Sequence, residues 1–212
     1  RGQNIGIYPN ENGAKASQIV KDNVALYAPP VTFYRVDDRT AKSPILPFMT
    51  LGQLEPPVFP ESGGERYVAI SPRLLKFMAA FGENVAAAGL DPQNIVVLRS
   101  FVSPNERQRL EQRGVSLAEF TRFQYGDAVA LVYAPGASNP AAAKMTDITN
   151  DGTVDLQDLE KFSAIAKQTM DELQNFGGLG LIAKYEGPGA AAGAPYVHVD
   201  LRGWYVAFRE GF

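Results

Sequence analysis

The chain contains no cysteine, so its fold cannot depend on disulfide bonds or on a zinc ion held by thiolates. Burial of hydrophobic side chains must therefore stabilise it, and 45% of its 212 residues are hydrophobic. A chain of this length can bury one sizeable core and is short for two, so a single domain is expected. The apolar runs are only a few residues long. A membrane-spanning helix needs roughly 20 residues, so no transmembrane segment is expected.

The charge balance argues against two classes of partner. The net charge is −3 at pH 7 and the sequence pI is ≈ 5.3. No basic run is available to attract nucleic acid or anionic lipid, so neither is expected as a partner. The chain begins at Arg1, without an initiator methionine or a signal peptide. This start fits a mature protein whose signal peptide has been removed, and it equally fits a fragment.

Hydrophobic spacing predicts both helices and strands. Ser71 and Pro72 are typical of a helix start, and apolar residues at spacings of three and four follow them as far as Gly89. Residues 95–98 have the length and composition of a buried strand. By the same criteria we expect a helix to begin after Ser103, a strand over 127–133, a helix over 156–173 and a strand over 196–202.

Residues 1–60 lack helical periodicity and are rich in proline. The pair Pro29 and Pro30 forbids helix and favours extended backbone, and residues 44–60 hold five prolines. We therefore expect residues 1–60 to form an extended N-terminal arm that packs on a domain formed by residues 61–212. The arm has two interpretations. It wraps over the surface of its own domain, or it docks on a partner, which exposed aromatic side chains would indicate.

Residues 147–158 have the composition and spacing of a calcium-binding loop. Gly152 stands at the sixth position, where such a loop turns sharply, and Val154 stands at the eighth, which is usually apolar. The expected oxygen ligands are Asp147, Thr149, Asp151, Thr153 through its backbone carbonyl, Asp155 and, in place of the more common Glu, Asp158. Calcium bound here would be structural. The alternative interpretation is an Asp-rich helix cap without a metal.

The chain has a single histidine, His198. A catalytic zinc ion is normally held by three histidines, by two histidines and a glutamate, or by two cysteines and a histidine. None of these sets can be built within this chain, so no zinc is expected. His198, Asp200 and Arg202 share one polar face of an alternating strand. The pair formed by His198 and Asp200 is either the remnant of a site or an ordinary hydrogen-bonded surface pair.

The stretch that begins at Thr121 is similar to a known family motif. The zinc D-alanyl-D-alanine carboxypeptidase and L-alanyl-D-glutamate endopeptidase superfamily carries the motif S-x-H-x-x-G-x-A-x-D, in which the His and the Asp bind zinc. Gly126 and Ala128 match its scaffold positions, and Thr121 replaces its Ser. Phe123 stands at the position of the His, and Ala130 stands at the position of the Asp. The motif therefore resembles half of a zinc site from which the ligands have been removed.

Further segments fall in the order found in the bacterial extracytoplasmic carboxypeptidase-like subgroup of this superfamily. They are residues 27–30, 33–36 and 50–54 for its N-terminal arm, 147–158 for its calcium-type loop, and 177–180 and 196–203 for its C-terminal segments. The departures fall on functional positions. Val102 stands where the family has the Arg that binds the substrate carboxylate, and Pro195 stands where many relatives have a catalytic Glu. His198 matches the third zinc ligand.

The resemblance implies an α+β domain with a mostly antiparallel sheet and helices packed against it. It also implies a pseudoenzyme whose cleft is plugged by Val102, Phe123 and Ala130. Without a metal ion to activate water and polarise the scissile carbonyl, amide hydrolysis has no evident driver. We therefore expect a non-catalytic structural or binding subunit of an extracytoplasmic assembly, in the periplasm or outside the cell. Its partners would be other protein subunits, reached through residues 22–60 and 133–146.

Two alternatives stay open. In the first, the chain is a peptidoglycan-binding module that keeps the cleft without the chemistry, although Val102 cannot hold a carboxylate as an Arg does. In the second, the chain is a hydrolase with a rebuilt site. There His198 and Asp200, together with Asp127, would hold a metal ion or act as acid and base.

Overall fold

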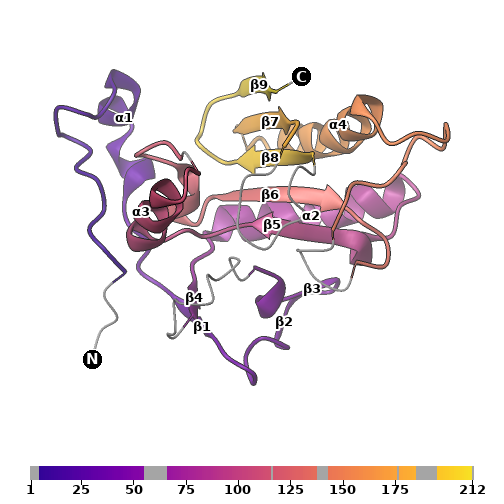
Figure 1. Ribbon diagram of the computed structural model, residues 1–212, viewed down its shortest axis with the longest axis horizontal. Helices are drawn as coiled ribbons and strands as arrows, with labels where there is room; N and C mark the ends of the chain where they lie inside the picture. The colour runs from indigo at the N-terminus through magenta and orange to yellow at the C-terminus, as the bar shows by residue number, and fades with distance from the viewer. Residues whose placement is uncertain are drawn as a thin grey trace.

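A five-stranded sheet lies at the centre of the computed structural model, which describes residues 5–54, 66–115, 117–137, 143–175, 177–184 and 195–211 (Figure 1). In spatial order its strands are β5 (Ile95–Arg99), β6 (Ala128–Tyr133), β8 (Tyr196–Asp200), β7 (Gly178–Ile182) and β9 (Val206–Glu210). Neighbouring strands are antiparallel except β7 and β9, which run parallel. The prediction of a mixed α and β fold with a mostly antiparallel sheet is therefore confirmed.

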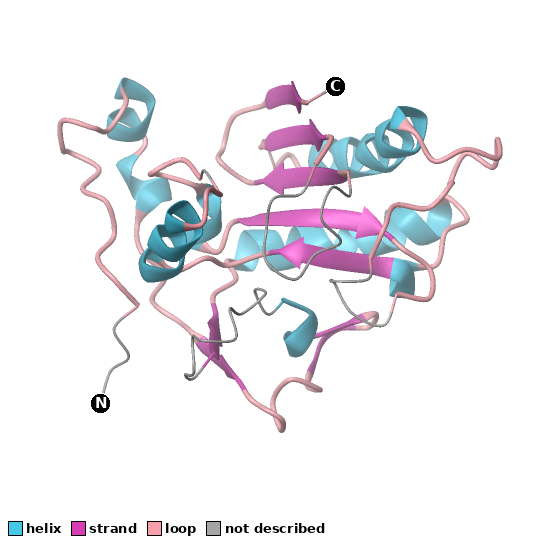
Figure 2. Ribbon diagram, in the orientation of Figure 1, coloured by secondary structure: helices cyan, strands magenta, loops and turns pink. Residues whose placement is uncertain are grey.

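Helices and two small sheets surround this central sheet (Figure 2). Among the described residues the α-helices are α1 (Gln18–Asp22), α2 (Pro72–Ala87), α3 (Pro104–Gln112) and α4 (Leu156–Glu172). The short 3-10 helices are η1 (Val24–Tyr27), η2 (Leu51–Leu54), η4 (Pro92–Asn94) and η5 (Arg122–Tyr125). The small sheets pair β1 (Tyr34–Val36) with β4 (Arg66–Val68), and β2 (Pro44–Leu46) with β3 (Met49–Thr50). In the part of the chain that the structure describes, no helix combines the length and the apolar character needed to cross a membrane.

The two long helices begin where their sequence signals predict. The side chain of Ser71 accepts a hydrogen bond from the N–H of Leu74 at 3.0 Å, which caps the first turn of α2. Asp155 and Asp158 form a capping box at the start of α4, so each carboxylate accepts a backbone N–H that the helix leaves unpaired. Such caps stabilise a helix by about 1 kcal/mol each, which fixes where α2 and α4 start.

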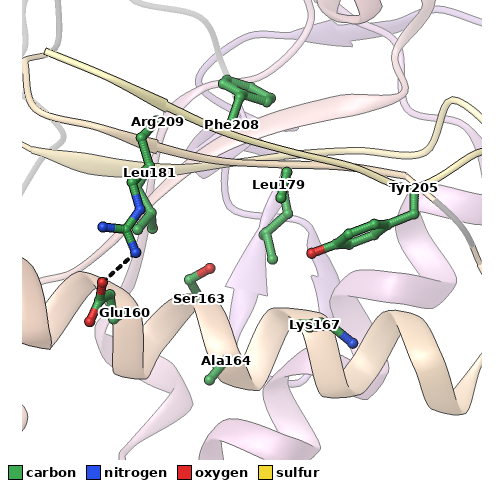
Figure 3. A pocket seen from close by; sticks show the side chains of 10 residues that line it. Glu160, Ser163, Ala164, Lys167, Leu179, Leu181, Tyr205, Phe208 and Arg209 are labelled. Carbon is green, nitrogen blue, oxygen red and sulfur yellow. Dashed lines mark hydrogen bonds and ion pairs between the residues drawn. The ribbon is translucent and has the colours of Figure 1, made fainter. Parts of the chain in front are cut away.

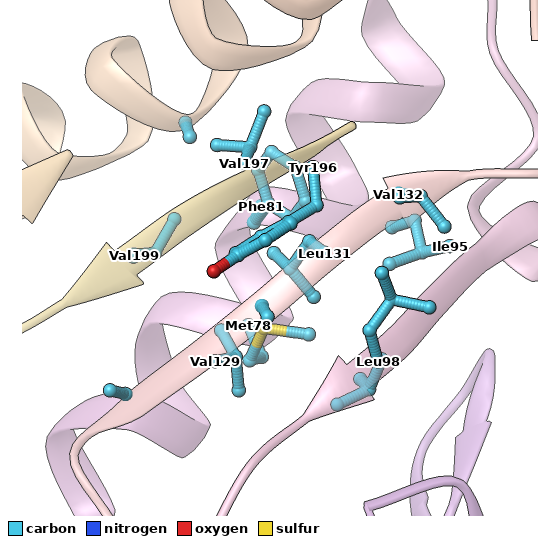
Figure 4. Close-up of a cluster of buried hydrophobic side chains, with 14 of the residues drawn as sticks. Met78, Phe81, Ile95, Leu98, Val129, Leu131, Val132, Tyr196, Val197 and Val199 are labelled. Carbon is cyan, nitrogen blue, oxygen red and sulfur yellow. The ribbon is translucent and has the colours of Figure 1, made fainter. Parts of the chain in front are cut away.

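The main core lies between these helices and one face of the sheet (Figure 4). The ring of Phe81 in α2 contacts the ring of Phe162 in α4, with 5.3 Å between their centroids. Leu131 in β6 and Val197 in β8 are fully buried in the same layer. Full burial of a large apolar side chain stabilises a fold by about 1.5–3 kcal/mol. The helices therefore hold one face of the sheet rigidly and leave the other face for a site.

The described part of the N-terminal arm packs on the domain. Its strand β1 pairs antiparallel with β4, and the hydroxyl of Tyr8 donates to the carbonyl of Gln124 at 3.1 Å. The arm also contains the helix α1, which the sequence did not predict because five residues are too few to show a periodic pattern. Residues 1–4 and 55–60 of the predicted arm lie outside the described residues. Four large apolar side chains in the described part of the arm are exposed: Ile7 is 91% exposed, Ile19 53%, Val31 98% and Tyr34 46%.

Candidate functional site

Three positions at which the similar family binds zinc lie side by side in the structure. Ala130 of β6 is paired with His198 of β8 in the register of the sheet. The ring of Phe123 in η5 lies edge-on to the imidazole of His198, with 5.3 Å between centroids and 83° between planes. Phe123 and Ala130 are buried, and the His198 side chain is 12% exposed. The fold thus brings His198 next to Phe123 and Ala130, which lie far from it in the sequence, and neither of these two residues carries a donor atom for a metal.

Val102 and Pro195 are two further positions at which the chain departs from the similar family. The N–H of Val102 donates to the carbonyl of Phe123 at 3.2 Å, and the side chain of Val102 is buried. Pro195 directly precedes β8 and is half-buried. Neither offers the guanidinium or the carboxylate that the resemblance would require at these positions.

An open cleft of ≈ 540 Å³ lies over His198. Phe123 forms part of its wall, whereas Val102 and Ala130 are buried and do not line it. The expectation that these three residues plug the cleft is therefore wrong. The physical reason is that the side chains of Val102 and Ala130 are short and are taken up by the core, so that they cannot fill a space of this size.

A second aromatic ring reaches His198 from a strand that sequence reasoning missed. The ring of Phe208 in β9 lies 5.5 Å from the imidazole of His198, tilted by 51°. Phe208 is paired with Gly180 of β7, and a Cβ added at Gly180 would come within 2.4 Å of the Phe208 ring. Because Gly180 has no side chain, the ring of Phe208 can pack directly over the backbone of β7 at this position. The short sequence of β9 gave no signal for this contact, because the parallel pairing with β7 depends on the whole fold.

Asp200 anchors the polar side of the cleft. It is fully buried, and its Oδ2 lies 2.9 Å from Nε2 of His198. Its Oδ1 accepts a hydrogen bond from Nε of Arg202 at 2.7 Å and one from the N–H of Gly178 at 3.1 Å, and Nη2 of Arg202 donates to Oδ2. Burial opposes the charge of Asp200, but the hydrogen bonds and charges of Arg202 and His198 outweigh it and lower the pKa of Asp200 well below its ordinary value.

The carboxylate of Asp127 is engaged elsewhere. It accepts hydrogen bonds from Oγ of Ser71 and from Nη2 of Arg73, at 2.5 and 2.6 Å, and it also pairs with Arg122. Arg122 lines the cleft, so Asp127 orients a wall residue from behind. The structure brings His198 and Asp200 together as a hydrogen-bonded pair. Asp127 instead contacts Ser71, Arg73 and Arg122, and none of its described side-chain hydrogen bonds involves His198. This geometry argues against a role of Asp127 in a rebuilt site.

The predicted calcium-type loop is closed by its own hydrogen bonds. Oδ1 of Asp147 accepts the N–H of Asn150 at 2.6 Å, and Oδ2 accepts the N–H of Gly152 at 2.8 Å. Asp158 is fully buried, and its Oδ1 accepts the N–H of Ile148 at 2.7 Å. Burial opposes the charge of Asp158, but hydrogen bonds from backbone N–H groups outweigh it and lower its pKa.

The residue types of this loop fit a hard cation that prefers oxygen ligands. Oγ1 of Thr149 lies 3.1 Å from a carboxylate oxygen of Asp147 and 3.1 Å from one of Asp158, so the first and last expected ligands approach the same point. Asp151 and Asp155 instead accept hydrogen bonds from Thr153 and Gln157. Within the described ranges, no three His, Asp or Glu side chains are placed to hold one metal ion. Calcium binding therefore stays a prediction from residue types.

A second, shallower groove of ≈ 380 Å³ lies on the opposite face of the sheet, between α4 and β9 (Figure 3). Leu179 and Leu181 of β7 line it, and Arg209 pairs with Glu160 across it at 2.6 Å. The ammonium group of Lys167 lies over the ring of Tyr205. Its charged side chains are engaged, since Arg209 pairs with Glu160 and Lys167 pairs with Asp171. The larger cleft over His198 contains the hydrogen-bonded pair of His198 and Asp200 and is therefore the stronger candidate for a functional site.

Comparisons with known proteins identify no relative of this chain. No protein family matches the chain, and neither a curated protein nor a solved structure is significantly similar to it. The resemblance to the zinc carboxypeptidase superfamily therefore remains a prediction that rests on the motifs described above.

Proposed function

We propose that the chain is a non-catalytic relative of the zinc D-alanyl-D-alanine carboxypeptidase superfamily. It would act as a structural or binding subunit of an extracytoplasmic protein assembly. One observation carries this proposal. The Phe123 ring lies against His198, and Ala130 is paired with the same histidine, so that the two positions matching the other zinc ligands flank the third.

The chemistry of zinc explains why this arrangement supports a pseudoenzyme. Zinc in proteins is bound by nitrogen, sulfur or carboxylate oxygen at about 2.0–2.3 Å. A phenyl ring and a methyl group offer none of these atoms. His198 itself is hydrogen-bonded to Asp200, which in turn is held by Arg202, so that the imidazole is already part of a stable polar cluster.

The surface of the arm supports a role in assembly. Val31 and Tyr34 expose 98% and 46% of their surface, next to a pair of prolines that keeps the backbone extended. Exposed apolar side chains on an extended segment offer a surface on which a protein partner can pack. The other expected contact region, residues 133–146, is described only in part, because residues 138–142 lie outside the described residues.

The decisive experiment measures zinc content and hydrolysis together. Purified protein is analysed for bound zinc and is incubated with cell-wall peptides that end in D-alanine. We expect neither stoichiometric zinc nor turnover. A double variant, Phe123→His with Ala130→Asp, restores the three ligand positions beside His198 and should gain zinc. Stoichiometric zinc or turnover in the wild type would overturn the proposal, and a double variant without zinc would count against the assignment of these positions.

One observation favours a second candidate, a hydrolase with a rebuilt site. The pair of His198 and Asp200, with 2.9 Å between Nε2 and Oδ2, lines an open cleft and has the geometry of a general base with its orienting carboxylate. Hydrolysis by the wild type that is lost in His198→Ala, and retained in Lys76→Met on α2, would establish this candidate. The remaining alternative, peptidoglycan binding, is tested by a pull-down with purified cell wall.

A further inference from the structure

The lining of the cleft over His198 combines positive charge with aromatic surface. Its basic side chains are Arg99, Arg122, Lys184 and Arg202, and its acidic ones are Asp200 and Glu210. Four basic groups line the cleft against two acidic ones, and a third carboxylate, that of Asp127, pairs with Arg122 from behind, which leaves a small excess of positive charge in a chain whose net charge is −3. A partly enclosed cleft strengthens the field of the charges that line it, so an anion is the ligand that its charge favours.

Two of the guanidinium groups are held rigidly from behind. Arg202 donates through Nε and Nη2 to Asp200, while 26% of its side chain remains exposed. Its Nη1 donates to no acceptor among the described residues and stays available to a ligand. Arg122 is fixed by Asp127 and by the carbonyl of Leu26, and its guanidinium lies 4.9 Å from the centroid of the Tyr27 ring. Arg202 presents a donor that is already oriented and therefore loses little freedom when it binds an anion. Arg122, whose side chain is only 4% exposed, contributes charge to the wall and no direct contact.

Aromatic side chains form the apolar part of the wall. Phe120, Phe123 and Phe208 line the cleft together with Tyr27 and Tyr196, and they come from segments on different sides of it. Flat aromatic surfaces favour a flat apolar group, which they contact by stacked or edge-on packing. The stem peptides of peptidoglycan carry carboxylates but no such group, so this wall favours a different ligand.

We propose that the cleft binds a small aromatic carboxylate. This inference rests on the proposed non-catalytic function, because it assigns a ligand to the same cleft and no reaction. The carboxylate would accept hydrogen bonds from Arg202, with Lys184 at the rim, and the ring would lie against Phe120 and Phe123. Such a carboxylate belongs either to a free aromatic acid or to the C-terminal residue of a peptide.

Calorimetric titration of the full chain tests this with matched probes. 2-Naphthoate carries the ring and the charge, 2-naphthamide has the same ring without the charge, and acetate has the charge without the ring. We expect 2-naphthoate to bind at least tenfold more tightly than either control. N-acetylphenylalanine separates the two sources: tighter binding than 2-naphthoate assigns the ligand to a peptide terminus, weaker binding to a free acid, and both results support the proposal.

Single substitutions test whether 2-naphthoate binds in this cleft. Arg202→Met should raise the Kd of 2-naphthoate at least fivefold, and Lys184→Met should raise it by a smaller factor. Lys76→Met, on a helix that covers the opposite face of the sheet, should leave it unchanged. If Arg202→Met fails to fold, Lys184→Met and the comparison of naphthoate with naphthamide decide the result.

Two outcomes overturn the proposal. The first is equal binding of 2-naphthoate and 2-naphthamide, or binding of neither. The second is a Kd for 2-naphthoate that the cleft variants leave unchanged. Both outcomes leave the non-catalytic function standing, because that function depends on zinc content and hydrolysis and not on this ligand.

Discussion

Gly180 leaves open the space that the ring of Phe208 occupies. A Cβ at position 180 would come within 2.4 Å of that ring, and the ring lies 5.5 Å from the imidazole of His198. One wall of the cleft thus depends on the absence of a side chain on the neighbouring strand.

The first prediction concerns this contact. Gly180→Ala should lower the free energy of unfolding by about 1–3 kcal/mol, because the added methyl group must displace the Phe208 ring or shift β9. Urea unfolding followed by circular dichroism measures the change. Ala207→Ser, which lies next to Phe208 in β9 but on the other face of the sheet, serves as the control. Equal stabilities of wild type and Gly180→Ala would contradict the packing described here.

The second prediction concerns the buried carboxylate of Asp200. Asp200→Asn should lower the free energy of unfolding at pH 7 by about 3 kcal/mol, because it removes one partner of a buried charged pair and leaves Arg202 uncompensated. Asp22→Asn, on the exposed surface of α1, should change stability by less than about 0.5 kcal/mol.

The same residue predicts a dependence on pH. The pKa of Asp200 in the folded protein lies well below its ordinary value of 3.8, so the unfolded chain takes up the proton first as the pH falls. Its stabilising contribution is complete above about pH 5 and is lost as the pH falls below about 4 toward the folded pKa. The difference in unfolding free energy between wild type and Asp200→Asn should therefore shrink between pH 7 and pH 3. A constant difference over this range would contradict the assigned pKa shift.

A third prediction separates calcium binding from helix capping in residues 147–158. Asp151→Ala should abolish the affinity for calcium, measured by calorimetry, and leave the unfolding free energy without calcium nearly unchanged, because Asp151 is exposed. Asp158→Ala should destabilise the calcium-free protein by about 1–3 kcal/mol, because buried N–H groups lose their acceptor. If the wild type binds no calcium at millimolar concentration, the loop is an Asp-rich helix cap alone.

A fourth prediction concerns the arm. Val31→Asp combined with Tyr34→Asp should lower the unfolding free energy by no more than about 1 kcal/mol, because Val31 is almost fully exposed and Tyr34 is about half exposed. The same double variant should lose the protein subunits that co-purify with the wild type. Ile19→Asp, also at an exposed apolar position, is the matched control and should retain them. Retention of all partners by the arm variant would contradict a role of this segment in assembly.

The elements with strong local signals were predictable from the sequence. The helix expected after Ser71 is α2 (Pro72–Ala87), and the strand expected over 95–98 is β5 (Ile95–Arg99). These signals are local. The helix cap, the proline at the first helical position and the apolar stripe all lie within one continuous segment, so that segment alone predicts the element. Strand β9 lacks such signals, because it lies at the edge of the sheet and alternates only weakly in burial.

The sequence predicted which residues belong to the candidate site but not how they are arranged in it. Family positions indicated Phe123, Ala130 and His198, and these are neighbours in the structure. The role of Phe208 depends on the pairing of β9 with β7, and the position of Arg122 depends in part on its hydrogen bond to the carbonyl of Leu26. Both are long-range relations that no local pattern contains. Residue type alone makes Asp127 a candidate member of a rebuilt site, whereas its geometry makes it the anchor of Arg73 and Arg122.

The position of His198 between two phenyl rings has a practical consequence. Its carbon-bound imidazole protons lie within the ring currents of Phe123 and Phe208. Since the chain has no other histidine, a one-dimensional proton spectrum contains a single pair of such signals from the native sequence. Any molecule that enters the cleft and turns either ring would shift that pair, so the unlabelled protein carries its own spectroscopic sensor of occupancy.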